Sequence, residues 1–140
     1  MAENNNIVSI DAFLRKNVAS TETQEVKFDR FGAPFMIQSV SEAKADALRK
    51  RATTKVKQNG AWTTSTNTNL FVDLLVTEAI VAPDLNNAQL QSDWGTPGKP
   101  IDTLKAMLLV GEYAELAKQV QSLSGFETED LEETADEVKN

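Results

Sequence analysis

The 140-residue chain contains neither cysteine nor histidine. Without cysteine it has no disulfide, no thiolate nucleophile and no sulfur ligand for a metal, which also suits a reducing cytoplasm. Without histidine it lacks the usual general base at neutral pH and the commonest transition-metal ligand. The common hydrolase triads and zinc sites are therefore excluded. We expect a protein that is not an enzyme and that carries no catalytic residue, metal or other cofactor.

Long apolar runs are also missing. The longest, such as Ala106 to Val110, fall far short of the roughly 20 residues that span a bilayer. The first residues, MAENNN, are polar and are not followed by the apolar stretch of a secretory signal. We therefore expect no membrane partner and a protein that works in the compartment where it is made.

Aromatic residues make up 6% of the chain, whereas hydrophobic residues together make up 41%. The core must therefore be mainly aliphatic, which favours helices. A chain of this length fits one domain and can bury a core without metal or disulfide. We expect a disordered N-terminus over residues 1–8, one globular domain over 9–126 and a flexible acidic tail over 127–140.

The net charge of −7 is unevenly placed. A basic cluster comprises Lys44, Arg49, Lys50, Arg51, Lys55 and Lys57, and the acidic tail carries Glu127, Glu129, Asp130, Glu132, Glu133, Asp136 and Glu137. An acidic protein repels phosphates, which argues against nucleic acid as the main partner. The basic cluster can be a solvated helix face, a nucleic-acid site, or a surface that meets an acidic patch of this chain or of a partner.

The first part of the chain predicts a short helix and a hairpin. Ser9 can cap a helix that presents Ile10, Phe13 and Leu14 on one side as a small docking element. From Gln24 the alternation of apolar and polar residues predicts a strand, and residues 35–40 predict a second. The glycine and proline of residues 31–34 supply the loop between them.

A helix is predicted to follow, with Ser39 and Glu42 as a capping box and Ser41 as a competing cap. Its apolar stripe comprises Ala45, Leu48, Ala52 and Val56. We expect this helix to end at residues 57–60, and residues 62–69 to form a loop.

Helical spacing of apolar residues then predicts a central core helix over about residues 70–82, ending before Pro83. A short helix is expected over residues 87–94, closed by Gly95, and a loop over residues 96–100. The two tryptophans, Trp62 and Trp94, are expected mainly in the core, with interface anchors as the alternative.

The stretch LLVGEYAEL, residues 108–116, places Gly111 inside a strongly helical pattern. On one continuous helix over 101–124 the apolar residues form two stripes roughly 120° apart. One stripe comprises Ile101, Leu104, Met107 and Leu108, and the other comprises Tyr113, Leu116, Val120 and Leu123. One straight helix cannot bury both against one surface. We therefore expect two helices joined by a tight turn at Gly111, with Gly125 ending the second.

Binding motifs are weak elsewhere. The loop at residues 95–100 has neither the glycine spacing nor the hydroxyl residue of a phosphate loop, and the tail lacks the pattern of a calcium loop. Leu131, Ala135 and Val138 recur at helical spacing in the tail, which is either solvated or forms an amphipathic helix on a partner. Our candidate partner-binding residues are Trp94, Tyr113, Phe126, Leu131 and Val138.

Three segments in this order carry a family resemblance: SVSEAKADALRKRATTK, VAPDLNNAQLQSDWG and LKAMLLVGEYAELAKQVQSLSGFE, followed by the acidic tail. Over about residues 24–140 the chain resembles the XkdN-like tail assembly chaperones of long-tailed phages and prophages. It has Val110 where the family commonly has proline before the glycine of GEY.

The resemblance implies a protein that binds the tape measure protein, keeps it soluble and helps recruit tail tube protein in the bacterial cytoplasm. It also implies absence from the mature virion. The alternatives are a structural minor tail component retained in the virion, and a nucleic-acid-binding regulator that uses the basic cluster. For the fold we expect α+β: a predominantly helical single domain with one β-hairpin near the N-terminus and a flexible acidic C-terminal tail.

Overall fold

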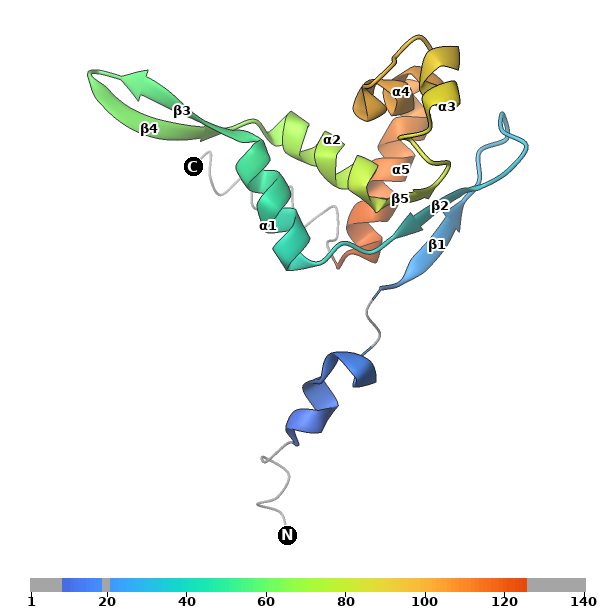
Figure 1. Ribbon diagram of the computed structural model, residues 1–140, viewed down its shortest axis with the longest axis horizontal. Helices are drawn as coiled ribbons and strands as arrows, with labels where there is room; N and C mark the ends of the chain where they lie inside the picture. Colours follow the sequence, from blue (N-terminus) through green and yellow to red (C-terminus); the bar gives the residue numbers. More distant parts are fainter. Residues whose placement is uncertain (1–8, 19–20, 126–140) are drawn as a thin grey trace.

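The computed structural model describes residues 9–18 and 21–125 (Figure 1). The expected disordered N-terminus and acidic tail, and the candidate residues Phe126, Leu131 and Val138, lie outside the described residues. The elements in chain order are η2 (Ile10–Phe13), η3 (Arg15–Asn17), β1 (Thr23–Val26), β2 (Phe35–Gln38), α1 (Glu42–Arg51), β3 (Thr53–Gln58), β4 (Ala61–Thr66), α2 (Thr68–Ala79), β5 (Ile80–Ala82), α3 (Ala88–Asp93), α4 (Pro100–Met107) and α5 (Val110–Leu123). The fold is mixed α+β, as expected.

A three-stranded antiparallel sheet has the order β1-β2-β5. In β1 and β2 the alternating pattern places Val26, Phe35 and Ile37 in the core. The rings of Phe28 and Phe31 meet Phe35 edge to face, with centroids 5.6 and 5.3 Å apart. The third strand, β5, replaces the predicted last turn of the central helix: the helix ends at Ala79, and the chain pairs with β2 instead.

The core lies between this sheet and helices α1, α2, α4 and α5 (Figure 1). It is mainly aliphatic, as the composition predicts, and its largest fully buried side chains are Phe35, Ile37, Leu104, Leu116, Val76, Val120 and Thr103. The predicted position of the two tryptophans is wrong, because Trp62 is 68% exposed and Trp94 is 37% exposed. Trp62 lies on β4, all of whose residues are exposed, and Trp94 follows the last residue of α3.

Asparagine caps begin two of the helices. The Asn67 side chain accepts a hydrogen bond from the Leu70 amide at the start of α2, and Asn87 accepts one from the Leu90 amide at the start of α3. These bonds satisfy amides that have no partner inside the helix. The short helix α3 ends before Gly95, whose φ of +72° suits a residue without a side chain.

The segment after α1 differs most from the prediction. Ser41, not Ser39, caps α1, and the helix ends at Arg51 instead of continuing to residue 57. Strands β3 and β4 then form a second hairpin where we predicted helix and loop. The turn is Asn59-Gly60, with φ of +52° and +81°. Both residues are left-handed, as a two-residue hairpin turn that matches the strand twist requires.

The break between α4 and α5 exists, but not at Gly111. The chain leaves α4 at Leu108 and passes Leu109 in extended conformation, with ψ of 144° and 162°. Gly111 is the second residue of α5 and has no positive φ. The reason for predicting a break is confirmed, since residues of both apolar stripes pack in one core. Gly125, with a φ of +98°, follows the end of α5 as predicted.

Replacing Gly111 by alanine is expected to stabilise the protein. A Cβ built at this position meets no atom within 4 Å, and the backbone is helical. Alanine reduces the entropy of the unfolded chain, so the free energy of unfolding should rise by roughly 0.4–1 kcal/mol in urea titrations. As a control, Gly95→Ala should lower it, because φ is +72° there. Destabilisation by Gly111→Ala would contradict this assignment.

Candidate functional site

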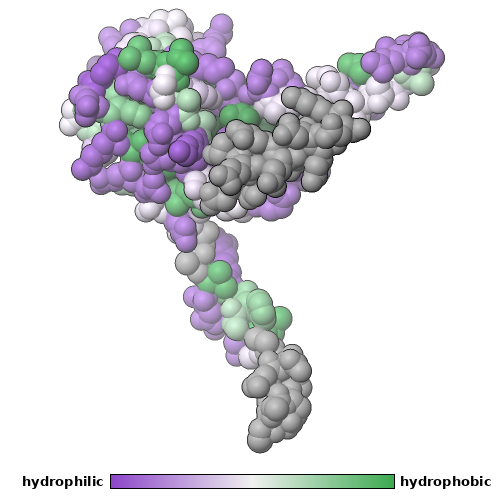
Figure 2. Space-filling model, turned by 180° about the vertical axis from the view of Figure 1, so that it is seen from behind, coloured by the Kyte–Doolittle hydropathy of each residue, from purple (hydrophilic) through white to green (hydrophobic). Residues whose placement is uncertain are grey.

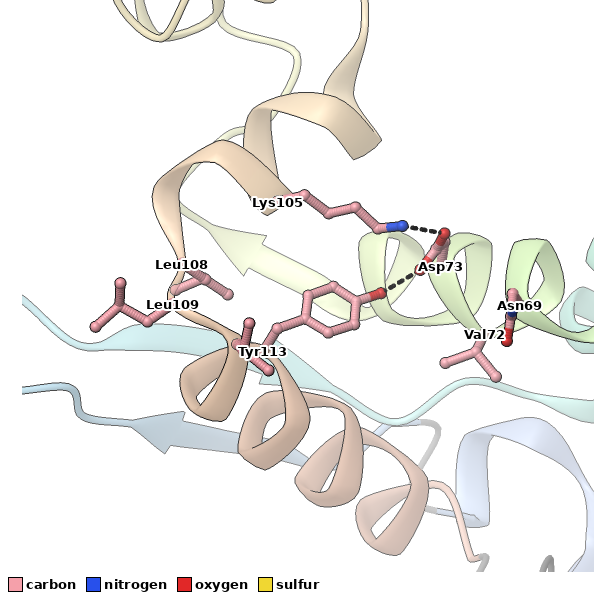
Figure 3. A pocket seen from close by; sticks show the side chains of 8 residues that line it. Asn69, Val72, Asp73, Lys105, Leu108, Leu109 and Tyr113 are labelled. Carbon is pink, nitrogen blue, oxygen red and sulfur yellow. Dashed lines mark hydrogen bonds and ion pairs between the residues drawn. The ribbon is translucent and has the colours of Figure 1, made fainter.

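A groove lies between α2 and the break that separates α4 from α5 (Figure 3). Its volume is about 460 Å³. The residues that line it are Asn69, Val72, Asp73, Lys105, Leu108, Leu109, Val110 and Tyr113. Five of these eight side chains are aliphatic or aromatic, so the groove offers an apolar surface with a small polar centre.

The rim of the groove is unusually apolar. Leu109 is 59% exposed and Val110 is 90% exposed. Leu109 is the N-cap residue of α5, and Val110 is its first residue. Both side chains face away from the core because the chain changes direction there. Serine, threonine, aspartate or asparagine normally stabilises a helix at the cap position. A leucine and a valine here add solvent-exposed apolar area instead.

The polar centre joins three helices. The Tyr113 hydroxyl donates to Oδ1 of Asp73 at 2.6 Å, and the Lys105 ammonium donates to Oδ2 at 2.6 Å (Figure 3). Lys105 Nζ also lies 5.8 Å from the centroid of the Tyr113 ring. Burial first, and then the hydrogen bond to the Asp73 carboxylate, raise the pKa of Tyr113 well above its ordinary value of 10.0. Tyr113 is therefore neutral and fixed in place.

Arg30, from the loop between β1 and β2, holds the break in place. Its guanidinium donates to both carboxylate oxygens of Glu112 and, at 2.8 Å, to the Met107 carbonyl at the end of α4. Glu112 in turn accepts a hydrogen bond from the Leu109 amide at 2.8 Å. The hydrogen bonds from Arg30 and then from Leu109 lower the pKa of Glu112, so this carboxylate stays charged at neutral pH. We call these four residues the joint clamp.

Of the two candidate partner-binding residues that the structure describes, one lies in the groove. Tyr113 lines its wall, whereas Trp94 follows the end of α3 and is not among the lining residues. Sequence reasoning missed Leu109 and Val110. On one continuous helix Leu109 fits either buried stripe, so its exposure becomes evident only when the break is placed before Val110.

The basic cluster is divided between two elements. On α1, Lys44 pairs with Glu78 at 3.9 Å, and Arg49 and Lys50 pair with Asp46 at 3.4 and 3.3 Å. Lys55 and Lys57 instead lie exposed on β3. The predicted single basic helix is therefore wrong.

Two further site types can be assessed over residues 9–18 and 21–125. No three acidic side chains in these ranges gather closely enough to hold a metal ion. No helix formed by them has the length and hydropathy to cross a membrane.

The pKa of Tyr113 leads to a direct prediction. Because this is the only tyrosine of the chain, tyrosinate absorbance reports it alone. In the folded protein it should stay protonated at about pH 10–11, where an unfolded tyrosine ionises. The raised pKa contributes stability that is fully present below the ordinary pKa and is lost as the pH rises above it.

Asp73→Asn should lower the pKa of Tyr113, since the negative charge beside the hydroxyl is removed, whereas Asp93→Asn on α3 should leave it unchanged. A pKa of Tyr113 close to its ordinary value in the folded native protein would contradict the hydrogen bond to Asp73.

Comparison with known proteins assigns the chain to a family. The family model described as "Phage XkdN-like tail assembly chaperone protein, TAC" matches residues 10–139. A solved crystal structure, titled as that of the protein yqbn, superposes with a TM-score of 0.73 at 22% sequence identity. The match covers 86% of this chain and 99% of the other, and it shows a shared fold. No curated protein matches the chain. Since the family model spans nearly the whole sequence, this protein belongs to the family of phage XkdN-like tail assembly chaperones.

Proposed function

We propose that this protein binds the tape measure protein of its phage and keeps it soluble until the tail tube assembles around it. The observation that carries the proposal is the family match over residues 10–139. It supports a role in tail assembly, and the groove between α2 and the α4–α5 break supplies a surface suited to that role.

The bound element is an amphipathic helix of the tape measure protein. Such a helix places apolar side chains at helical spacing into a groove of matching character. Leu109 and Val110 offer apolar contacts along one side, and Val72 offers them on the other. The Asp73 and Lys105 pair in the centre accepts a polar residue and fixes the orientation of the helix.

The net charge of −7 serves the same function. A complex with a long apolar partner aggregates less when one component carries a large charge of one sign. We further propose that the protein acts without enzymatic activity in the bacterial cytoplasm, helps recruit tail tube protein and is absent from the mature virion. The exposed N-terminal residues Ile10 and Phe13 and the half-exposed Trp94 are candidate second contacts.

Co-expression with the neighbouring tape measure protein tests the proposal. The native protein should raise the soluble yield of the tape measure protein and co-purify with it. The double variant Leu109→Ser/Val110→Asp should lose both effects, because it removes the apolar rim of the groove. Absence of complex and of added solubility with the native protein would contradict the chaperone role itself.

The variant Leu109→Ser/Val110→Asp is expected to lose binding without losing stability. Serine at the cap can accept a hydrogen bond from the Glu112 amide and complete a capping box, and aspartate in the first turn interacts favourably with the helix dipole. Its thermal midpoint should therefore equal or exceed that of the native protein. Trp62→Ala is the matched control, since it removes a larger exposed apolar side chain outside the groove and should leave binding intact. Binding by the double variant would show that the partner uses another surface.

A further inference from the structure

The hairpin β3–β4 projects from the body of the protein, and we call it the arm (Figures 1 and 2). Every residue of β4 is exposed, and the arm forms a sheet of two strands only. Isolated two-stranded hairpins are marginally stable in water, and a partner that packs on one face stabilises them. The arm therefore offers an exposed face on which a partner can pack.

The charge of the arm has one sign. Strands β3 and β4 carry Lys55 and Lys57 and no acidic residue, and Arg51 at the end of α1 lies just before them. Among the described residues, no ion pair neutralises Arg51, Lys55 or Lys57. This basic arm belongs to a protein whose net charge is −7.

The strand register gathers these groups on one face. Lys57 lies opposite Trp62, and Lys55 lies opposite Thr64. Side chains of opposed residues point to the same side of a sheet, so Lys55, Lys57 and Trp62 share a face. Lys57 Nζ is 5.9 Å from the Trp62 ring centroid. This face combines positive charge with one large exposed apolar side chain.

We propose that residues 126–140 of the same molecule bind this face of the arm. Their sequence, FETEDLEETADEVKN, carries seven acidic residues and one lysine. It also carries the apolar residues Phe126, Leu131 and Val138, of which Val138 is far enough along the chain from Ser124 to contact the indole of Trp62. The segment thus matches the arm in charge and in its mixture of acidic and apolar side chains.

The segment begins close enough to reach the arm. The Val40 amide donates to the Ser124 hydroxyl at 3.0 Å, so the chain leaves α5 beside the start of α1. Helix α1 spans about 15 Å, and the strand β3 beyond it spans about 20 Å. Fifteen residues in extended form reach about 50 Å. A connection within one molecule is therefore possible along the whole arm.

Contact quenching of a fluorophore tests this in the full-length chain. Because the chain has no cysteine, Thr134→Cys can be labelled uniquely with bimane, a dye that tryptophan quenches near contact. A Trp94→Phe background leaves Trp62 as the only tryptophan. We expect lower bimane emission than in the same protein carrying Trp62→Phe, and loss of the difference at about 1 M salt, where screening is short-ranged. Equal emission in both proteins at low salt would overturn the proposal.

Charge variants identify the surface. Lys55→Gln/Lys57→Gln should lose the quenching, whereas Lys99→Gln/Lys118→Gln, which removes the same charge outside the arm, should keep it. The salt experiment uses a protein with the native arm. Its result therefore remains valid even if the lysine variant disturbs the hairpin. Excess unlabelled protein should leave the quenching unchanged. Weaker quenching in the presence of unlabelled protein would show that the acidic segment binds a second copy. This result would overturn binding within one molecule.

Discussion

Arg30 bridges the two ends of the α4–α5 break, where the last third of the protein changes direction. One guanidinium binds the final carbonyl of α4 and the carboxylate of Glu112 in the first turn of α5. Glu112 also satisfies the amide of Leu109. The break would otherwise leave several polar backbone groups without partners. Across this break, Leu104 of α4 and Leu116 of α5 enter the same core.

The apolar groove is a consequence of that geometry. Redirecting the chain at Leu108 turns Leu109 and Val110 toward solvent, beside Val72 of α2. The Asp73 carboxylate then connects Tyr113 and Lys105, so all three helices around the groove are fixed by polar contacts. A surface held this rigidly loses little entropy when a helix binds. The lining of the groove includes no residue of the arm.

Sequence periodicity predicted those elements whose side chains pack against the core. The helices α2 and α5 and the strands β1 and β2 show clear apolar spacing because one face of each is buried. The Asn59-Gly60 dipeptide was the signal for the arm. In our prediction this dipeptide is part of the end of the helix, because Ala52 and Val56 continue the apolar stripe of α1 and β4 has no buried face to indicate a strand.

The groove was harder to predict, because its side chains come from residues 69 to 113 and meet only in the folded protein. Tyr113, which belongs to the GEY segment, is the one groove residue among our candidates. The clamp could not be predicted, since Arg30 and Glu112 are 82 residues apart and no local pattern connects them. The break was expected at Gly111 because glycine marks many helix ends, but the clamp stabilises extended backbone at Leu109 instead.

The central claim is that the groove held by the joint clamp receives an apolar helix of the tape measure protein. Hydrogen exchange of the native protein, alone and in the purified complex, tests it most directly. The account predicts slower exchange at residues 69–73 and 105–113 in the complex, with little change in β4. Slower exchange confined to the arm or to α3, with residues 105–113 unchanged, would contradict it.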